Sequence, residues 1–203
     1  MSVPARALGR LRPNTTALFV CDIQERFREH IHGFAALASA SQKMLAAAKL
    51  LDVPVYVTEQ YPQRLGKTVE ELDISAAEVV LPKTKFSMFL PEIQEALRTR
   101  KITSIILLGI EAHVCVQQTA LDLLENDYDV HVLSDAVSSM NYPETQLALE
   151  RLRQSGAFIT SSESALFQLA GDAKHPNFKE ISNLVKKYQE ATRTSPLLYK
   201  SSI

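Results

Sequence analysis

The chain has only two cysteines, Cys21 and Cys115, and no tryptophan. An extracellular domain of 203 residues usually carries a larger set of disulfide-forming cysteines, so we expect a reducing compartment. No apolar run approaches the roughly 20 residues that a membrane-spanning helix needs. We therefore expect no membrane partner.

The chain also lacks an excess of either charge. Lysine and arginine total 22 and the acidic residues total 23, which gives a formal net charge of -1. Both signs are scattered along the chain, so there is no positive surface to attract nucleic acid or anionic lipid. We expect a small-molecule substrate and no nucleic-acid partner.

The two ends of the chain differ in composition from its centre. Residues 1–15 carry three arginines and no acid, without the apolar stretch of a signal peptide. We interpret them as a flexible N-terminal arm, and a short mitochondrial transit peptide is the alternative. Residues 191–203 resemble a loose C-terminal tail, which leaves one domain over residues 16–190. We expect a cytoplasmic protein.

Strand and helix patterns alternate along the whole domain, which is typical of an α/β fold. The predicted strands span residues 17–21, 55–58, 78–82, 102–108, 130–135 and 157–160. The predicted helices span residues 34–51, 91–100, about 119–124, 143–154, 163–170 and 177–188. Right-handed helical crossovers then predict a three-layer, doubly wound, Rossmann-like domain whose six-stranded parallel sheet has the order 3-2-1-4-5-6.

This strand order brings Asp22 and Cys115 to one crevice, because they follow the first and fourth strands at the topological switch point. Cys115 comes near the start of a helix, where the helix dipole and unpaired N–H groups favour a thiolate. Its alternative role is packing as a small buried residue. Asp22 could take the thiol proton or cap a helix that starts near Gln24. The residues alone leave both pairs of alternatives open.

Three segments resemble the signature segments of the isochorismatase-like cysteine hydrolases. They are Phe19–Gln24, Lys83–Phe89 and Gly109–Val116, and they follow the family's order and spacing within a similarity that covers about residues 16–172. The segments Thr58–Pro62 and Gln154–Phe158 are most similar to the isochorismatase domain-containing protein 2 branch.

The resemblance implies a catalytic triad of Asp22, Lys83 and Cys115. The aspartate would take the thiol proton, the lysine would stabilise the thiolate, and the sulfur would attack a carbonyl carbon to form a thioester-type intermediate. It also implies a cis peptide bond between Ile110 and Glu111, with backbone N–H groups near Val114 as donors to the oxyanion.

The departures from the family are equally informative. Nicotinamidases of this superfamily bind a metal through an Asp-x-His pair and a further histidine after the second strand, whereas this chain has Thr58–Tyr61 there. No histidine lies between His32 and His113, so we expect no metal and no other cofactor. True isochorismatases do not need the cysteine, so Cys115 favours amide or imide chemistry over isochorismate cleavage.

Four further residues are candidates for substrate binding, namely Gln24, Phe27, Glu59 and His113. Glu59 and its neighbour Gln60 follow the second strand and either line the crevice or face solvent. His113 is a candidate pocket or interface residue. Specificity is expected to depend on the loops of residues 60–74 and 138–142.

Two residues near the triad have open roles. Lys85 could compete for the role of Lys83. Cys21 is expected to be inert packing, and it would form a redox pair with Cys115 only if their Cα atoms lie within about 7 Å.

The sequence therefore predicts a hydrolase that acts on C–N bonds other than peptide bonds, with a small amide, ureide or carbamate as substrate. The alternative is a catalytically silent protein that acts through protein partners. Relatives assemble, so we expect a homo-oligomer, either a dimer or a tetramer.

Overall fold

The computed structural model describes residues 8–198, and the predictions for residues 1–7 and 199–203 lie outside the described residues. Its centre is a six-stranded sheet in the order β3-β2-β1-β4-β5-β6, with every pairing parallel. The strands are β1 (Thr16–Cys21), β2 (Val55–Gln60), β3 (Val79–Lys83), β4 (Ser104–Ile110), β5 (Asp129–Ser138) and β6 (Phe158–Thr160). The predicted fold class and strand order are confirmed.

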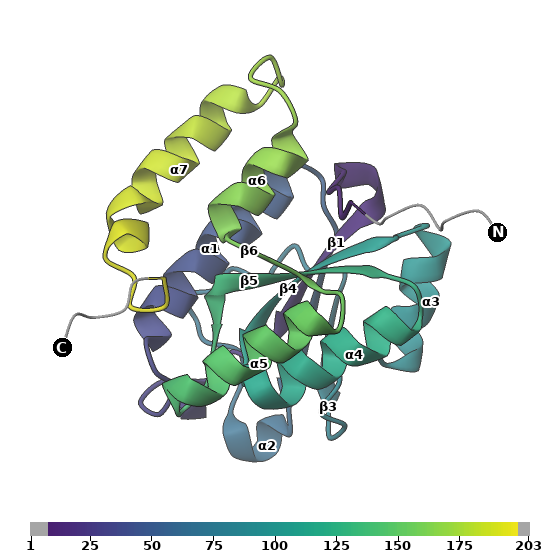
Figure 1. Ribbon diagram of the computed structural model, residues 1–203, viewed down its shortest axis with the longest axis vertical. Coiled ribbons are helices and arrows are strands. Elements are labelled where there is room, and N and C mark those ends of the chain that lie inside the picture. The colour runs from purple at the N-terminus through teal and green to yellow at the C-terminus, as the bar shows by residue number, and fades with distance from the viewer. Residues whose placement is uncertain (1–7, 199–203) are drawn as a thin grey trace.

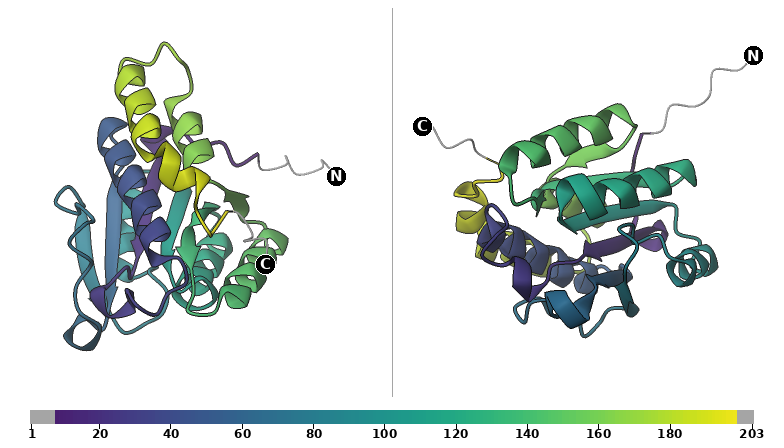
Figure 2. Two further views of the ribbon diagram at one scale, coloured as in Figure 1. Left: turned by 90° about the vertical axis from the view of Figure 1, so that its left-hand side faces the viewer. Right: turned by 90° about the horizontal axis from the view of Figure 1, so that it is seen from below.

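Helices cover both faces of the sheet (Figures 1 and 2). One layer contains α1 (Phe34–Leu50), α6 (Ser162–Ala170) and α7 (Phe178–Arg193). The other contains α3 (Pro91–Thr99), α4 (Gln117–Glu125) and α5 (Tyr142–Gln154). The short helix α2 (Pro62–Leu65) lies at the lower edge of the molecule in Figure 1. This is the predicted three-layer arrangement.

The central strands are buried from end to end, because both faces of a parallel sheet are covered by crossover helices. All residues of β1 and β4 are buried, and both strands are almost continuously apolar. Alternate side chains of β1 point to opposite faces: Leu18 and Val20 pack on the α1 side, whereas Phe19 and Cys21 pack on the α4 side.

Strand register brings the carboxyl ends of β1, β2 and β4 to one level. Cys21 pairs with Thr58 of β2 and with Gly109 of β4. A Cβ atom at Gly109, where φ is +124°, would lie 2.1 Å from the carbonyl oxygen of Cys21. Only glycine permits this approach, and the strand that was predicted to stop before Gly109 continues to Ile110.

The packed chain extends beyond the predicted limits of residues 16 and 190. Leu11 is buried just before the 3-10 turn η1 (Pro13–Thr15). At the other end α7 continues to Arg193, and Leu197 is buried beside Gly33. Apolar side chains at both ends find core contacts that local composition does not reveal. Within residues 8–198, no helix is both long and apolar enough to cross a membrane.

Candidate active site

Asp22 is the first residue after β1, and its carboxylate is buried. Its φ of +52° is in the left-handed region, which is uncommon for a residue other than glycine. Oδ1 accepts a hydrogen bond from the Thr58 hydroxyl at 2.8 Å, and Oδ2 accepts one from Lys83 Nζ at 2.7 Å. The 3-10 turn η2 (Glu25–Phe27) begins three residues later and has no side-chain cap, so the capping role considered for Asp22 is wrong.

Lys83 is the last residue of β3, and its side chain is 1% exposed. Besides Asp22, its Nζ donates to Gln60 Oε1 at 2.6 Å and to the backbone carbonyls of Phe86 at 2.8 Å and Lys85 at 3.1 Å. Four acceptors therefore surround one ammonium group.

Cys115 lies in a single π-helical turn, η3 (Ala112–Val116), immediately before α4, and is 6% exposed. Thr119 Oγ1 donates to the Cys115 carbonyl at 2.6 Å and accepts from the Met88 N–H at 2.9 Å. This threonine links the cysteine turn to the loop that follows Lys83. The peptide bond between Ile110 and Glu111 is cis, as the resemblance implies.

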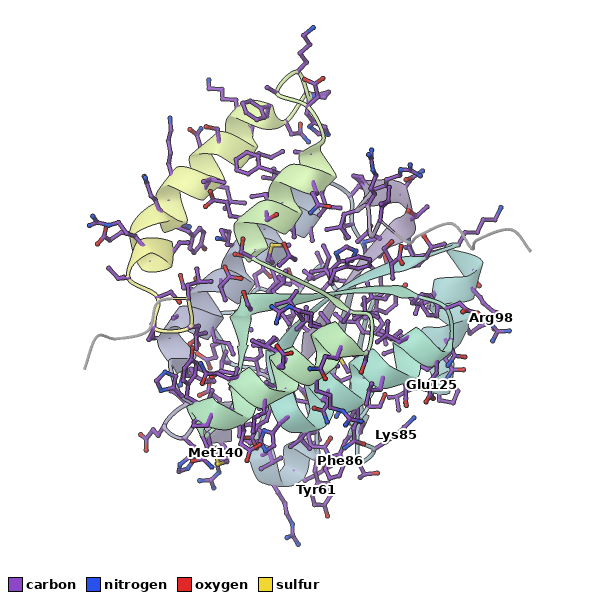
Figure 3. The ribbon with its side chains drawn as sticks, in the orientation of Figure 1. Tyr61, Lys85, Phe86, Arg98, Glu125 and Met140 are labelled. Carbon is purple, nitrogen blue, oxygen red and sulfur yellow. The ribbon has the colours of Figure 1, made fainter. Side chains whose placement is uncertain are left out.

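A pocket of about 310 Å³ brings Asp22 and Cys115 into one wall. Its other lining residues are Phe27, Gln60, Tyr61, Arg64, Leu65, Phe86, Ile110, Glu111 and Val114. Tyr61 and Phe86 lie at the lower end of the molecule in Figure 3, where Met140 is also exposed. A larger cavity of about 630 Å³ lies beside α1 and α7 and contains none of the triad residues, so its size does not make it the candidate site.

The isochorismatase domain model matches residues 16–164 of the chain. The chain belongs to the isochorismatase family. Among curated relatives, it is 49% identical over 180 residues to isochorismatase domain-containing protein 1 of Danio rerio, covering 88% of this chain and 64% of the relative. This chain therefore spans less than two thirds of the length of that protein.

Other family members are similar along almost their whole length. Isochorismatase domain-containing protein 2 of Homo sapiens is 47% identical over 92% of this chain and 91% of its own. The secreted isochorismatase effector Isc1 of Phytophthora sojae is 50% identical over 93% and 92%. The structure of the MAR1 ribonuclease of Caenorhabditis elegans has a TM-score of 0.84 and 44% identity, covering 87% of this chain and 92% of that one. The predicted membership of the isochorismatase-like superfamily is confirmed, as is the predicted similarity to the isochorismatase domain-containing protein 2 branch.

Three of the four residues predicted to bind substrate do not line the pocket of this isochorismatase-family protein, whereas Phe27 does. Glu59 does not line the pocket, and its carboxylate accepts hydrogen bonds from the Thr68 N–H at 2.7 Å and hydroxyl at 2.9 Å. Gln24 is fully buried and binds the Gln60 backbone and the Gly66 carbonyl. His113 Nδ1 lies 2.9 Å from Ser139 Oγ. The first two hold the loop after β2 rather than the substrate space.

Gln60 was considered together with Glu59 as a residue that could line the crevice, and of the two it is Gln60 that lines the pocket. Successive side chains of a strand point to opposite faces, so when β2 continues to Gln60, Glu59 and Gln60 separate. Tyr61, Arg64 and Leu65 also come from the 60–74 loop, which was expected to determine specificity. The sequence indicated that this loop lies at the crevice, but it did not indicate which of the loop's side chains point into the pocket.

One backbone donor of the predicted oxyanion region is already occupied. The Val114 N–H, which was expected near the oxyanion, donates to the Glu111 carbonyl at 3.0 Å. The Glu111 side chain accepts from the Met140 N–H at 2.9 Å. Val114 and Glu111 both line the pocket, but this N–H is available to a ligand only after its present bond opens.

Lys85 and Cys21 are close to the predicted triad in sequence or in space, but their contacts differ from those of the triad residues. Lys85 forms an ion pair with Asp122 at 2.7 Å and its side chain is 54% exposed, so its competition for the role of Lys83 is excluded. Cys21 is fully buried and its Sγ donates to Asp22 Oδ2 at 3.6 Å, and burial raises the pKa of the Cys21 thiol well above its ordinary value. Both cysteines are free thiols.

Proposed function

We propose that this isochorismatase-family protein hydrolyses a small amide, ureide or carbamate with Cys115 as the nucleophile. The single observation that carries the proposal is that Asp22 and Cys115 share one pocket wall while Lys83 is buried against Asp22. This arrangement supplies a base and a nucleophile on one pocket wall, and a compensating charge in contact with the base.

In the proposed reaction, Asp22 takes the proton of the Cys115 thiol and the sulfur attacks the carbonyl carbon. The C–N bond of the tetrahedral intermediate then breaks, and Asp22 returns the proton to the leaving nitrogen. Water attacks the remaining thioester with Asp22 again as base, which releases the acid and restores the thiol. Lys83 acts electrostatically through Asp22, because its N–H groups are already engaged by acceptors.

The pocket favours a small substrate with an apolar portion. Its volume is about 310 Å³, at the lower end of the range typical of small-molecule sites. The aromatic side chains of Phe27, Tyr61 and Phe86 and the aliphatic side chains of Leu65 and Val114 form much of its wall. We expect the acyl or carbamoyl group to sit at Cys115 and the apolar part to contact these side chains.

Ribonuclease activity is the second candidate, and the 44% identity to the nematode MAR1 ribonuclease favours it. RNA binding depends on cationic side chains that face the phosphates. This chain has a net charge of -1, Lys83 and Lys85 are paired with acids, and Arg64 is the one arginine in the pocket wall. The test is cleavage of a labelled RNA by the wild type and by Cys115→Ala. Cleavage by the wild type that is lost in the variant would favour ribonuclease activity over amide hydrolysis.

The remaining predictions need separate tests. Homo-oligomer formation is measured by light scattering, and the cytoplasmic location by fractionation of cells. The catalytically silent alternative predicts that Cys115 has no enhanced reactivity.

Alkylation with iodoacetamide tests the proposed nucleophile directly. We expect Cys115 to react faster with iodoacetamide than a free small thiol does at the same pH, and the fully buried Cys21 to remain unmodified. The Cys21→Ala variant should be labelled like the wild type, whereas Cys115→Ala should not be labelled. Ordinary thiol reactivity at Cys115 would contradict the enzymatic proposal.

A substrate panel then identifies the reaction. Small amides, ureides, carbamates and isochorismate are incubated with the wild type and with Cys115→Ala. Release of ammonia or amine by the wild type alone would support the proposal, and turnover of isochorismate by both proteins would replace it.

A further inference from the structure

The Lys83 ammonium has more acceptors than protons. An ammonium group has three N–H donors, whereas four oxygens lie within 3.1 Å of Nζ. One of the four must therefore remain without a full hydrogen bond from Lys83.

Gln60 Oε1 makes the shortest of the four contacts, at 2.6 Å, and the Lys85 carbonyl makes the longest, at 3.1 Å. An amide oxygen has two acceptor lone pairs, so Gln60 Oε1 can accept a second hydrogen bond while it keeps the one from Lys83. Asp22 is charged and buried, so its attraction for the ammonium is the strongest of the four. Within residues 8–198, no other donor reaches the carbonyls of Lys85 and Phe86, and leaving either without a partner would be costly. Gln60 is neutral, partly exposed and in the pocket wall.

The orientation of the Gln60 side chain is held from two sides. Its Nε2 donates to the Thr84 carbonyl at 2.9 Å, which directs Oε1 toward Lys83. Its backbone N–H and carbonyl both bind the side chain of the fully buried Gln24, at 2.7 and 2.9 Å. The amide is thus fixed before any ligand enters.

We propose that Gln60 is a specificity-determining residue whose side-chain carbonyl accepts a hydrogen bond from an N–H group on the substrate's reacting carbonyl. This inference rests on the proposed function and narrows it to carboxamides, ureides and carbamates that carry an N–H, in preference to esters. The two carboxylates of the wall are engaged: Asp22 accepts from Thr58, Lys83 and the Cys21 thiol, and Glu111 accepts from the Met140 N–H. Gln60 Oε1 shares the Lys83 nitrogen with Asp22, so it lies beside the proposed base.

Two alkylating reagents of matched size test the inference without a known substrate. Bromoacetamide carries N–H donors, and methyl bromoacetate carries none. The thiolate of Cys115 displaces bromide from either reagent and forms a thioether. We divide the rate constant for bromoacetamide by that for methyl bromoacetate, and then divide this ratio by the same ratio for a free small thiol. The thiolate fraction of Cys115 cancels in the first ratio, and the intrinsic difference between the two reagents cancels in the second step.

We expect the wild type to prefer bromoacetamide. Gln60→Met keeps the length of the side chain but removes the acceptor, and should lower the ratio by about five- to tenfold, as the loss of one hydrogen bond does. Gln60→Glu keeps an acceptor oxygen and should retain the preference. Gln63→Met is the matched control, because Gln63 is exposed on α2 and outside the pocket wall.

The outcomes separate the two proposals. An unchanged ratio in a folded Gln60→Met protein, or an equal fall in Gln63→Met, would overturn the role of Gln60 while leaving Cys115 as nucleophile. If Gln60→Met does not fold, Gln60→Asn is the second test. Its side chain is one methylene shorter, so the acceptor oxygen lies farther from the ligand and the ratio of the two alkylation rates must fall. Wild-type Cys115 that reacts no faster than the free thiol with either reagent would overturn the proposed function itself.

Discussion

The Lys83 ammonium lies 2.7 Å from Asp22 Oδ2, and each of these side chains is 1% exposed. Removing one partner of such a pair leaves a buried charge without compensation. We predict that Lys83→Met lowers the free energy of unfolding by about 3–5 kcal/mol, and that the double variant Asp22→Asn with Lys83→Met recovers part of this loss. Urea unfolding at neutral pH measures both values.

A comparison with Lys85 controls for the loss of a lysine. Lys85→Met removes an ion pair with Asp122 whose lysine is 54% exposed, so its effect should be below about 1 kcal/mol. Equal losses of unfolding free energy for Lys83→Met and Lys85→Met would contradict the prediction that the buried Lys83–Asp22 pair is the costlier one to break.

Gly109 is predicted to tolerate no side chain. In Gly109→Ala the new Cβ would lie 2.1 Å from the Cys21 carbonyl oxygen, in the strand pairing that leads to Cys115. We expect a loss of about 3 kcal/mol or more, or failure to fold. Gly156→Ala is the control, because its φ is also positive, at +102°, but no atom of the described part of the chain lies within 4 Å of the added Cβ. A loss at Gly109 no greater than at Gly156 would contradict the close approach of β1 and β4.

His131 should make the protein less stable in acid. It is 1% exposed, its Nε2 has no hydrogen-bond partner among residues 8–198, and it stacks on Phe158 with 4.9 Å between ring centroids. Burial lowers its pKa from 6.5 to about 4. Between these values the unfolded chain binds the proton and the folded chain does not, so the free energy of unfolding falls as pH decreases through this window.

The expected contribution of His131 is about 2 kcal/mol of stability lost between pH 7.5 and pH 5.0. Replacing it in His131→Phe should remove this part of the pH dependence. Unfolding by urea at the two pH values gives the difference for the wild type and the variant. The same difference in both proteins would argue against a neutral buried imidazole.

Glu59 is predicted to stabilise the loop after β2 and not to bind substrate. Glu59→Ala leaves the Thr68 N–H and hydroxyl without their acceptor, which should lower the free energy of unfolding by about 1–3 kcal/mol and change Cys115 alkylation by less than about threefold. Glu59→Gln keeps the acceptor oxygen and should lose less stability. A large change in the rate of Cys115 alkylation without a change in stability would instead support a substrate-binding role for Glu59.

Local sequence pattern was sufficient to predict the strands that precede Asp22 and Cys115. The continuous apolar run of β1 and its equivalent in β4 are typical of strands buried on both faces, and handed crossovers then leave few possible orders for the sheet. The proximity of Asp22 and Cys115 to one crevice follows from that order.

The same reasoning did not distinguish Glu59 from Gln60, because both were expected to follow the second strand. The strand extends to Gln60, and its period of two sends the two side chains to opposite faces. The end of β2 depends on its pairing with β3, where Gln60 lies opposite Lys83. Composition of the 58–61 segment contains no information about this pairing.

The amino-acid sequence by itself determined the fold class, the strand order and the family, because these depend on periodicity and on short segments whose residues are neighbours along the chain. Only the tertiary structure decided which oxygens surround Lys83, which way Gln60 and Glu59 point, and that Leu11 and Leu197 are packed. Those contacts join residues far apart in the chain, and their geometry depends on strand register and side-chain packing that no single segment encodes.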